Sequence, residues 1–254
     1  MPPPGSRVRR LAARGIYEAG TIAGRWPSVA LPVARWRGHG EPLDARTDLV
    51  VEGFPRSSNS LTVALLAAAQ PGEIRIAHHV HAPAHVIEAV HRRLPTLVLV
   101  REPSEAVVEL VLLKPALSVR QVLRGWVRFH APLVPRRRGF VVASSSEVPE
   151  GLDDVVRRLN ERFGTSFFPP DVSGNLVASA EAAMTEYWEG RSGPGLPLVG
   201  RTSERETDRE RDRERLQRAC AAQALASLRE GAERLHRSFT SGPPHLGGSA
   251  GGRL

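Results

Sequence analysis

The residues of this chain best suited to chemistry follow a short apolar run, in the segment Gly53-Phe54-Pro55-Arg56-Ser57-Ser58-Asn59-Ser60-Leu61. A turn of small polar residues between a strand and a helix presents backbone N–H groups to a phosphate, and the helix dipole attracts the negative charge. A Walker A loop would carry a lysine after its second glycine. This chain has Ser58-Asn59-Ser60 at that point, and its only lysine is Lys114. Arg56 is therefore the only cation of the segment, which predicts an anion-binding loop and disfavours a nucleotide-dependent kinase.

Three further polar segments follow this loop along the chain. They are His79-Val80-His81-Ala82-Pro83, Arg101-Glu102-Pro103-Ser104-Glu105, and Glu147 together with the helix end Arg162-Phe163-Gly164. A histidine with a pKa of about 6.5 suits a general base at neutral pH. An arginine can hold a phosphate through two parallel hydrogen bonds. His81 and Arg101 are therefore the candidates for these two tasks.

The four segments together resemble the sulfotransferases that use PAPS (3′-phosphoadenosine 5′-phosphosulfate). In their exact residues they are most similar to a bacterial sulfotransferase-like branch. The loop corresponds to the family's P-[KR]-S-G-T-T, His81 stands at the place of the family's histidine base, and Arg101 opens a segment similar to R-[DN]-P-x-[DE]. Glu147 and Gly164 follow in the family's order. The resemblance covers about residues 46–168 and implies a P-loop-like fold and PAPS as the sulfuryl donor.

The resemblance also implies roles for individual residues. The loop residues that would bind the 5′-phosphosulfate are Pro55, Arg56, Ser57, Ser58, Asn59, Ser60 and Leu61. Arg56 would also stabilise the charge that develops on the bridging oxygen, and Arg101 would take the 3′-phosphate. His81 would accept the proton of an acceptor hydroxyl or amine. The implied activity is transfer of a sulfuryl group from PAPS to an unidentified acceptor.

Two departures from the family pattern leave other functions open. Glu109 stands where the family has a serine that helps to hold the 3′-phosphate. Its carboxylate would repel a phosphate unless it turned away, and Ser104 or Ser118 could replace the missing hydroxyl. Ser58 replaces a glycine, the residue that best allows close backbone approach, while Asn59 tolerates unusual backbone angles. One alternative is a catalytically inactive sulfotransferase-like binding or interaction protein. The other is a nucleotide-dependent kinase, which the missing lysine disfavours.

The elements that would position these residues alternate between strands and helices. Apolar runs predict buried strands at residues 48–53, 74–78, 96–100 and 139–143, and helices are predicted at 59–70, 83–93, 103–113 and 152–163. Continuous apolar strands that alternate with helices indicate a parallel sheet covered on both faces. The predicted class is therefore α/β, a parallel central sheet flanked by helices of the P-loop NTPase-like sulfotransferase type, with a long C-terminal helix.

The segments around this core differ from it in composition. Residues 1–45 are predicted to be a basic, partly disordered lead-in, and 169–200 an irregular lid or acceptor loop rich in Pro, Gly and Ser. Residues 201–240 predict one long charged helix with many i,i+4 pairs, and 241–254 a disordered tail.

The positive charge lies in the ends of the chain. Residues 1–47 carry eight arginines against three acids and residues 201–254 eleven against eight, whereas residues 48–200 carry sixteen bases and sixteen acids. The net charge of +8 is therefore absent from the core, which disfavours nucleic acid as the partner.

Composition bounds the remaining possibilities. One cysteine, Cys220, excludes an internal disulfide and predicts a small buried thiol, and no stretch approaches the roughly 20 apolar residues of a membrane span. The histidines at 78, 79, 81 and 85 lack further ligands apart from Glu88, so no metal is expected. Trp126 and Phe129 share a helix face, as core residues or as the wall of an acceptor pocket. We expect a cytoplasmic protein, a small-molecule or glycan acceptor, and a possible homo-oligomer.

Overall fold

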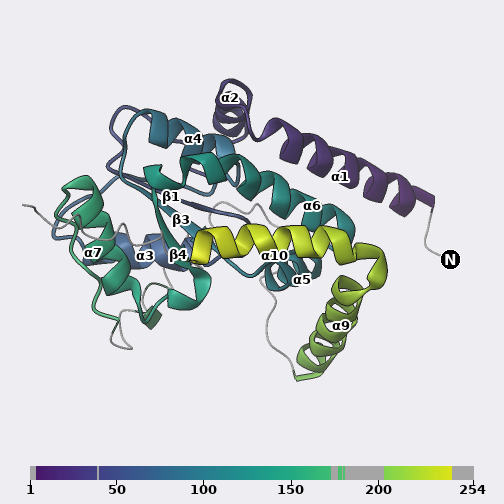
Figure 1. Ribbon diagram of the computed structural model, residues 1–254. Helices are drawn as coiled ribbons and strands as arrows, with labels where there is room; N and C mark the ends of the chain where they lie inside the picture. The colour runs from purple at the N-terminus through teal and green to yellow at the C-terminus, as the bar shows by residue number, and fades with distance from the viewer. Residues whose placement is uncertain (1–3, 39, 173–176, 179, 181–202, 242–254) are drawn as a thin grey trace, which may run out of the picture.

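A four-stranded parallel sheet forms the centre of the computed structural model, which describes residues 4–38, 40–172, 177, 178, 180 and 203–241 (Figure 1). Its strands are β1 (Leu49–Gly53), β2 (Ile76–His78), β3 (Thr96–Val100) and β4 (Val141–Ser144), in the order β2-β1-β3-β4. Every residue of β1 and β3 is buried, because helices cover both faces of the sheet. The predicted α/β class with a parallel central sheet is confirmed.

Two layers of helices enclose the sheet. On one face lie α3 (Asn59–Ala69) and α7 (Leu152–Phe163), whose leucines and valines pack on inward residues of β1, β3 and β4. The opposite face is covered by α4 (Pro83–His91), α5 (Pro103–Leu113), α6 (Val119–His130) and α10 (Ala226–Thr240). Short 3-10 segments, η1 (Ala131–Gly139) and η2 (Ser145–Glu147), flank β4.

The helix boundaries follow from local chemistry. Pro83 and Pro103 open α4 and α5, at the position where proline's missing N–H costs nothing. The Ser118 and Gln121 side chains form a capping box at the start of α6. Gly164 ends α7 in the left-handed conformation with a φ of 65°, as a glycine after a helix readily does. These signals explain why the sequence predicted the starts of α4 and α5 and the end of α7.

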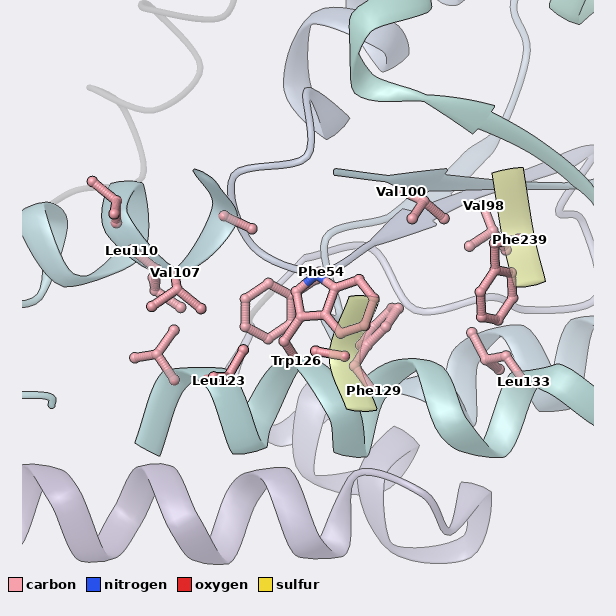
Figure 2. Close-up of a cluster of buried hydrophobic side chains, with 14 of the residues drawn as sticks. Phe54, Val98, Val100, Val107, Leu110, Leu123, Trp126, Phe129, Leu133 and Phe239 are labelled. Atoms are coloured by element: carbon pink, nitrogen blue, oxygen red, sulfur yellow. The ribbon is translucent and has the colours of Figure 1, made fainter. Parts of the chain in front are cut away.

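The larger core cluster joins the sheet to α5, α6 and α10 and contains most of the buried aromatic side chains. Trp126 and Phe129 rise from α6 toward Phe54, which follows β1, and Phe239 of α10 lies near Val98 (Figure 2). The predicted core role of Trp126 and Phe129 is therefore confirmed. Cys220 is a buried free thiol of the same cluster, and burial raises its pKa to about 11.

The N-terminal segment differs from the expected flexible lead-in. It forms α1 (Pro4–Ala23), which packs on α6, and α2 (Pro27–Arg37), which packs on α4 (Figure 1). Leu31 and Ala34 bury one side of α2 against Val80, Ala82 and Ala84. Helix α2 starts at Pro27 but also contains Pro32. An internal proline ordinarily breaks a helix, so it concealed this element in the sequence.

The predicted single C-terminal helix is two helices. Helix α9 (Ser203–Ala221) ends where Ala222 becomes extended, and α10 follows after the 3-10 turn η3 (Gln223–Leu225). The break lets each half bury a different face, since α9 packs along α5 whereas α10 packs on α6 and the sheet. Most of the predicted lid at 169–200 and the tail from 242 lie outside the described residues. Within the described residues, no helix is long and apolar enough to cross a membrane.

Candidate active site

The strand order creates a crevice at one edge of the sheet. After β1 the chain moves outward to β2, whereas β3 lies on the other side of β1 and leads to β4. Ligands of open α/β sheets bind beyond the carboxyl ends of the strands at such a change of direction. The register pairs Gly53 with Leu99. The segments that follow them, from Phe54 and from Arg101, therefore begin side by side.

The loop between β1 and α3 has an unusual backbone. Arg56 and Ser58 have φ angles of 72° and 63°, both in the left-handed region. Ser58 occupies the position where the sulfotransferase loop has glycine, and it keeps the conformation that glycine adopts most easily, which for other residues costs about 1 kcal/mol. Asn59, expected to absorb the strain, instead begins α3. The first backbone N–H groups of α3 have no acceptor within the helix and lie at its loop end.

Two polar atoms of the loop are buried without a hydrogen-bond partner among the residues that the structure describes. They are the Ser57 Oγ and the Asn59 Oδ1, in side chains that are almost fully buried. The Asn59 amide nitrogen donates to the Phe54 carbonyl at 3.3 Å, which closes the loop. Buried polar atoms normally have partners. The Ser57 hydroxyl can donate to an oxygen of a bound anion such as a phosphate or sulfate, whereas the Asn59 Oδ1 can only accept and lies beside Gly53.

Arg56 and Arg101 are brought together as predicted. The Arg101 Nη1 donates to the Arg56 carbonyl at 2.9 Å, and its Nε contacts Glu105 at 3.1 Å. The Arg56 side chain is exposed and leaves the loop toward Glu109. Each of the two guanidinium groups is paired with a carboxylate, Arg101 with Glu105 and Arg56 with Glu109.

Glu109 lies among three arginines from two parts of the chain, the loop after β1 and α9. Its carboxylate is 2.6 Å from Arg213, 3.7 Å from Arg56 and 3.8 Å from Arg209. Arg209 and Arg213 belong to α9, so the charged helix contributes to the site. Three positive charges around one carboxylate leave a surplus, and the predicted repulsion of an anion by Glu109 is thereby offset.

The serines considered as substitutes at Glu109 have other tasks. The Ser104 hydroxyl donates to Glu102, whose side chain caps α5. The Ser118 hydroxyl caps α6 and contacts Gln121 at 3.1 Å. Neither serine therefore replaces the missing hydroxyl. Glu147 likewise caps η2 and contacts Arg158 at 2.6 Å, which makes it structural.

A buried carboxylate that sequence reasoning missed organises the other side of the crevice. Glu52 ends the apolar run of β1 and is fully buried. It accepts hydrogen bonds from the backbone N–H groups of Gly53 (3.0 Å), Val80 (3.1 Å) and His81 (3.2 Å), and from the His85 Nδ1 (2.8 Å). Burial alone would raise the pKa of Glu52, but these hydrogen bonds and the neighbouring histidines lower it below its usual value. The signal for this role was an acid within a buried strand.

His81 is held in a defined orientation by this network. Its φ is 53°, and its backbone N–H is bound to Glu52. The ring Nδ1 lies 3.0 Å from the Gly53 carbonyl, which can only accept, so Nδ1 carries the proton in the neutral ring. The basic nitrogen of neutral His81 is therefore Nε2. Nearby, His79 bonds Ser60 at 2.8 Å and thereby links the second polar segment to the loop.

A cavity of about 740 Å³ adjoins the loop and His81. Its floor contains Phe54, Pro55 and His81, and its walls come from α1, α2 and α6. Phe129 contributes to the wall, as the alternative prediction for this residue had it. Most lining side chains are small or apolar: Ile16, Gly20, Ala23, Gly24, Val29, Ala30, Val33, Ala34, Val80, Ala82 and Pro83. Pockets of this size and character hold small molecules with a mainly apolar body.

The cavity is shaped by a close contact between α1 and α6. The Tyr17 hydroxyl packs against Gly125, where a Cβ would lie 2.2 Å from the hydroxyl oxygen. That oxygen is buried without a hydrogen-bond partner, and burial raises the pKa of Tyr17, so the hydroxyl stays neutral. Only glycine at position 125 lets the N-terminal helix approach closely enough to wall the cavity.

The structure brings most of the predicted site residues to the carboxyl ends of β1 and β3. Arg101 bonds Arg56 of the loop, Arg56 contacts Glu109, Pro55 and His81 line the cavity, and Leu61 is partly buried. The residues missed by sequence reasoning are Glu52, Arg209 and Arg213. Among the described residues, no three His, Cys, Asp or Glu side chains are grouped as metal ligands would be.

The similarity of this chain to known proteins lies among solved structures. No protein-family model matches the chain, and no curated protein matches it by sequence. Among solved structures, the chain is similar to mouse sulfotransferase SULT7A1 complexed with PAP. The two are 12% identical with a TM-score of 0.38, and the match covers 75% of this chain and 90% of that chain. Function is therefore argued from the residues of the site.

Proposed function

We propose that this protein is a sulfotransferase that moves a sulfuryl group from PAPS to a hydroxyl or amine of a small, mainly apolar acceptor. The observation that carries the proposal is the joining of an anion-binding loop, marked by a buried Ser57 hydroxyl without a partner among the described residues, to a cavity lined by His81. Anion binding and a general base are the two requirements of sulfuryl transfer, in which positioning and electrostatics do most of the work.

The loop and its arginines would hold PAPS, which supplies an activated sulfuryl group when bound. The amides at the start of α3, with Ser57, Asn59 and Ser60, would bind the 5′-phosphosulfate. Arg56 would stabilise negative charge on the oxygen that leaves the sulfur. Arg101 would hold the 3′-phosphate, and Arg209 and Arg213 would offset Glu109 on the same side.

His81 would act as the base toward the acceptor. Its Nδ1 proton is engaged by the Gly53 carbonyl, so Nε2 is the atom that can take a proton from an acceptor hydroxyl. The apolar lining favours a small molecule with an apolar body over a glycan, because sugar hydroxyls would lose their hydrogen bonds to water there. Glu52 would serve as a positioning residue, since it holds the backbone of His81.

The activity is tested with labelled PAPS and a panel of phenols, long-chain alcohols and sugars. Label should pass to apolar members of the panel, and His81→Ala should lower turnover about 10²- to 10⁴-fold, the usual contribution of a general base. Binding of 3′,5′-adenosine bisphosphate should stay nearly unchanged in that variant, because the His81 backbone N–H and ring Nδ1 bind Glu52 and Gly53 of β1. Equal losses of turnover and nucleotide binding would assign His81 a structural role.

The alternative of a binding protein without activity rests on Glu109. Its ion pair with Arg56 occupies the arginine on which transfer depends. Tight binding of 3′,5′-adenosine bisphosphate, with no transfer to any acceptor and no release of sulfate from PAPS, would favour this alternative.

A further inference from the structure

The outer side of the two N-terminal helices carries most of the large apolar side chains that the described residues expose. Eleven such side chains are exposed, and eight of them lie between residues 8 and 36: Val8, Leu11, Ile16, Ile22, Trp26, Val29, Val33 and Trp36. Trp36 is 81% exposed. Contiguous apolar surface on a water-soluble fold usually marks a binding surface.

Helix α1 divides into an inner polar side and an outer apolar side. On the inner side Arg14 bonds the Ala116 carbonyl at 2.8 Å, and Arg128 of α6 contacts Glu18 and Thr21. At 3.6 residues per turn, the outer side spans about 140° without a charged residue. Its members are all exposed: Val8, Leu11, Ala12, Gly15, Ile16, Ala19 and Ile22.

Helix α2 repeats this division. Its inner side packs through Leu31 and Ala34, and its outer side spans about 100° of uncharged residues. The exposed members of that side are Val29, Pro32, Val33 and Trp36. Ile16 of α1 and Val29 and Val33 of α2 also line the cavity, so the two outer sides meet at its mouth. Together with Trp26 they form what we call the N-terminal apolar surface.

Arginines border this surface. Residues 4–38 contain seven arginines and one acid, and Arg7 and Arg9 of α1 and Arg35 and Arg37 of α2 flank the apolar sides. Helices that lie flat on membranes combine an apolar face with flanking Arg or Lys, and tryptophan prefers the boundary between lipid and water. We propose that the N-terminal apolar surface docks on a lipid bilayer that contains anionic lipids.

Charge distinguishes a bilayer from a second copy of the chain. Two copies that paired symmetrically through this surface would place the same arginine-bordered face against itself. Like charges across an interface oppose association, whereas anionic headgroups would neutralise the arginines. The proposal does not depend on the proposed sulfuryl transfer. It would place the mouth of the cavity at the bilayer, where an apolar molecule could enter it.

Sedimentation with vesicles tests the proposal. The full chain should sediment with vesicles of equal parts phosphatidylcholine and phosphatidylglycerol, sediment far less with phosphatidylcholine alone, and bind less as salt rises. Leu11→Glu should weaken binding at least about tenfold, because one buried leucine is lost from the lipid contact. Leu113→Glu is the matched control, since Leu113 lies outside this surface and is similarly exposed, at 59% against 65% for Leu11.

A variant that removes one arginine charge measures the electrostatic part of vesicle binding. Arg9→Gln should weaken binding to the mixed vesicles about fivefold, the effect of one arginine near an anionic surface. Failure to bind either vesicle, or equal effects of Leu11→Glu and Leu113→Glu, would overturn the proposal. So would a dimer of the wild-type chain that Leu11→Glu dissociates in sedimentation velocity, because the surface would then belong to a second copy. Unchanged melting temperatures show that each variant is folded.

Discussion

Glu52 and Glu109 are two carboxylates near the carboxyl ends of the strands, and their surroundings suit one to a structural role and the other to ligand binding. Glu52 is fully buried and bound to three backbone N–H groups and the ring Nδ1 of His85. Glu109 is partly buried, with 12% of its side chain exposed, and faces three arginines. The donors around Glu52 are fixed by the fold, whereas the arginine side chains around Glu109 also contact solvent.

The difference explains which of the two can take part in ligand binding. The donors of Glu52 belong to the backbone or to a buried ring and cannot leave without unfolding that edge of the sheet. The arginines around Glu109 have long side chains, and an incoming phosphate could replace the carboxylate as their partner. Glu52 therefore acts on the position of His81, and Glu109 on the charge of the crevice.

The largest expected effect is on stability at Glu52. Glu52→Ala should lower the free energy of unfolding by about 3–5 kcal/mol, because buried donors lose their acceptor. Glu52→Gln keeps an acceptor oxygen and should cost clearly less. Urea unfolding followed by circular dichroism measures both, and a loss below about 1 kcal/mol in the alanine variant would remove Glu52 from its structural role.

A buried histidine should dominate the loss of stability in mild acid. His130 stacks on Trp126 with ring centroids 3.8 Å apart, and its Nδ1 donates to the Trp126 carbonyl at 2.9 Å. Burial lowers its pKa to about 3, so between about pH 6.5 and 3 only the unfolded chain takes up this proton. Unfolding free energy should fall by about 2 kcal/mol from pH 6.5 to 5. His236, whose pKa burial also lowers, adds to the same trend.

Glu52 also loses its stabilisation as pH falls, but in a lower pH window than His130. The lowered pKa of Glu52 means that its stabilisation is complete above the usual pKa of glutamate and is lost only as pH falls further.

Above pH 5 the pH dependence of stability should therefore come mainly from His130. His130→Phe should flatten the slope of unfolding free energy against pH in this range, while His91→Phe, at an exposed position on α4, should leave the slope unchanged. Equal slopes in the wild type and His130→Phe would contradict the assignment of the loss of stability in mild acid to His130. Urea unfolding across this pH range measures it.

The smallest effect on stability is expected at Glu109. Glu109→Gln should change the free energy of unfolding by no more than about 1 kcal/mol, because partly exposed ion pairs contribute little. The same change should strengthen binding of 3′,5′-adenosine bisphosphate roughly fivefold, since one negative charge leaves the crevice. Weaker binding by calorimetry would mean that Glu109 orients the arginines for the ligand, which would reverse the distinction from Glu52.

The sequence predicted the sheet, and placed Arg56 and Arg101 after two of its strands, for a physical reason. Buried parallel strands are continuous apolar runs, and the polar residues that follow them lie at the same edge. The approach of Arg209 and Arg213 could not be predicted, because acids and arginines alternate around every side of α9. Only the tertiary contact with α5 decides which of them face inward. The N-terminal helices escaped prediction because their outer sides are apolar and one contains a proline.

Calorimetry with 3′,5′-adenosine bisphosphate tests the central claim most directly. The wild-type chain should bind this nucleotide, and Arg56→Ala and Arg101→Ala should each weaken binding by about 1.5–3 kcal/mol, the contribution of a hydrogen bond to a charged group. Arg136→Ala is a suitable control, because Arg136 is exposed on η1, where its Nη1 donates to the Pro132 carbonyl. No binding at millimolar nucleotide, or equal affinity in all four proteins, would contradict the account.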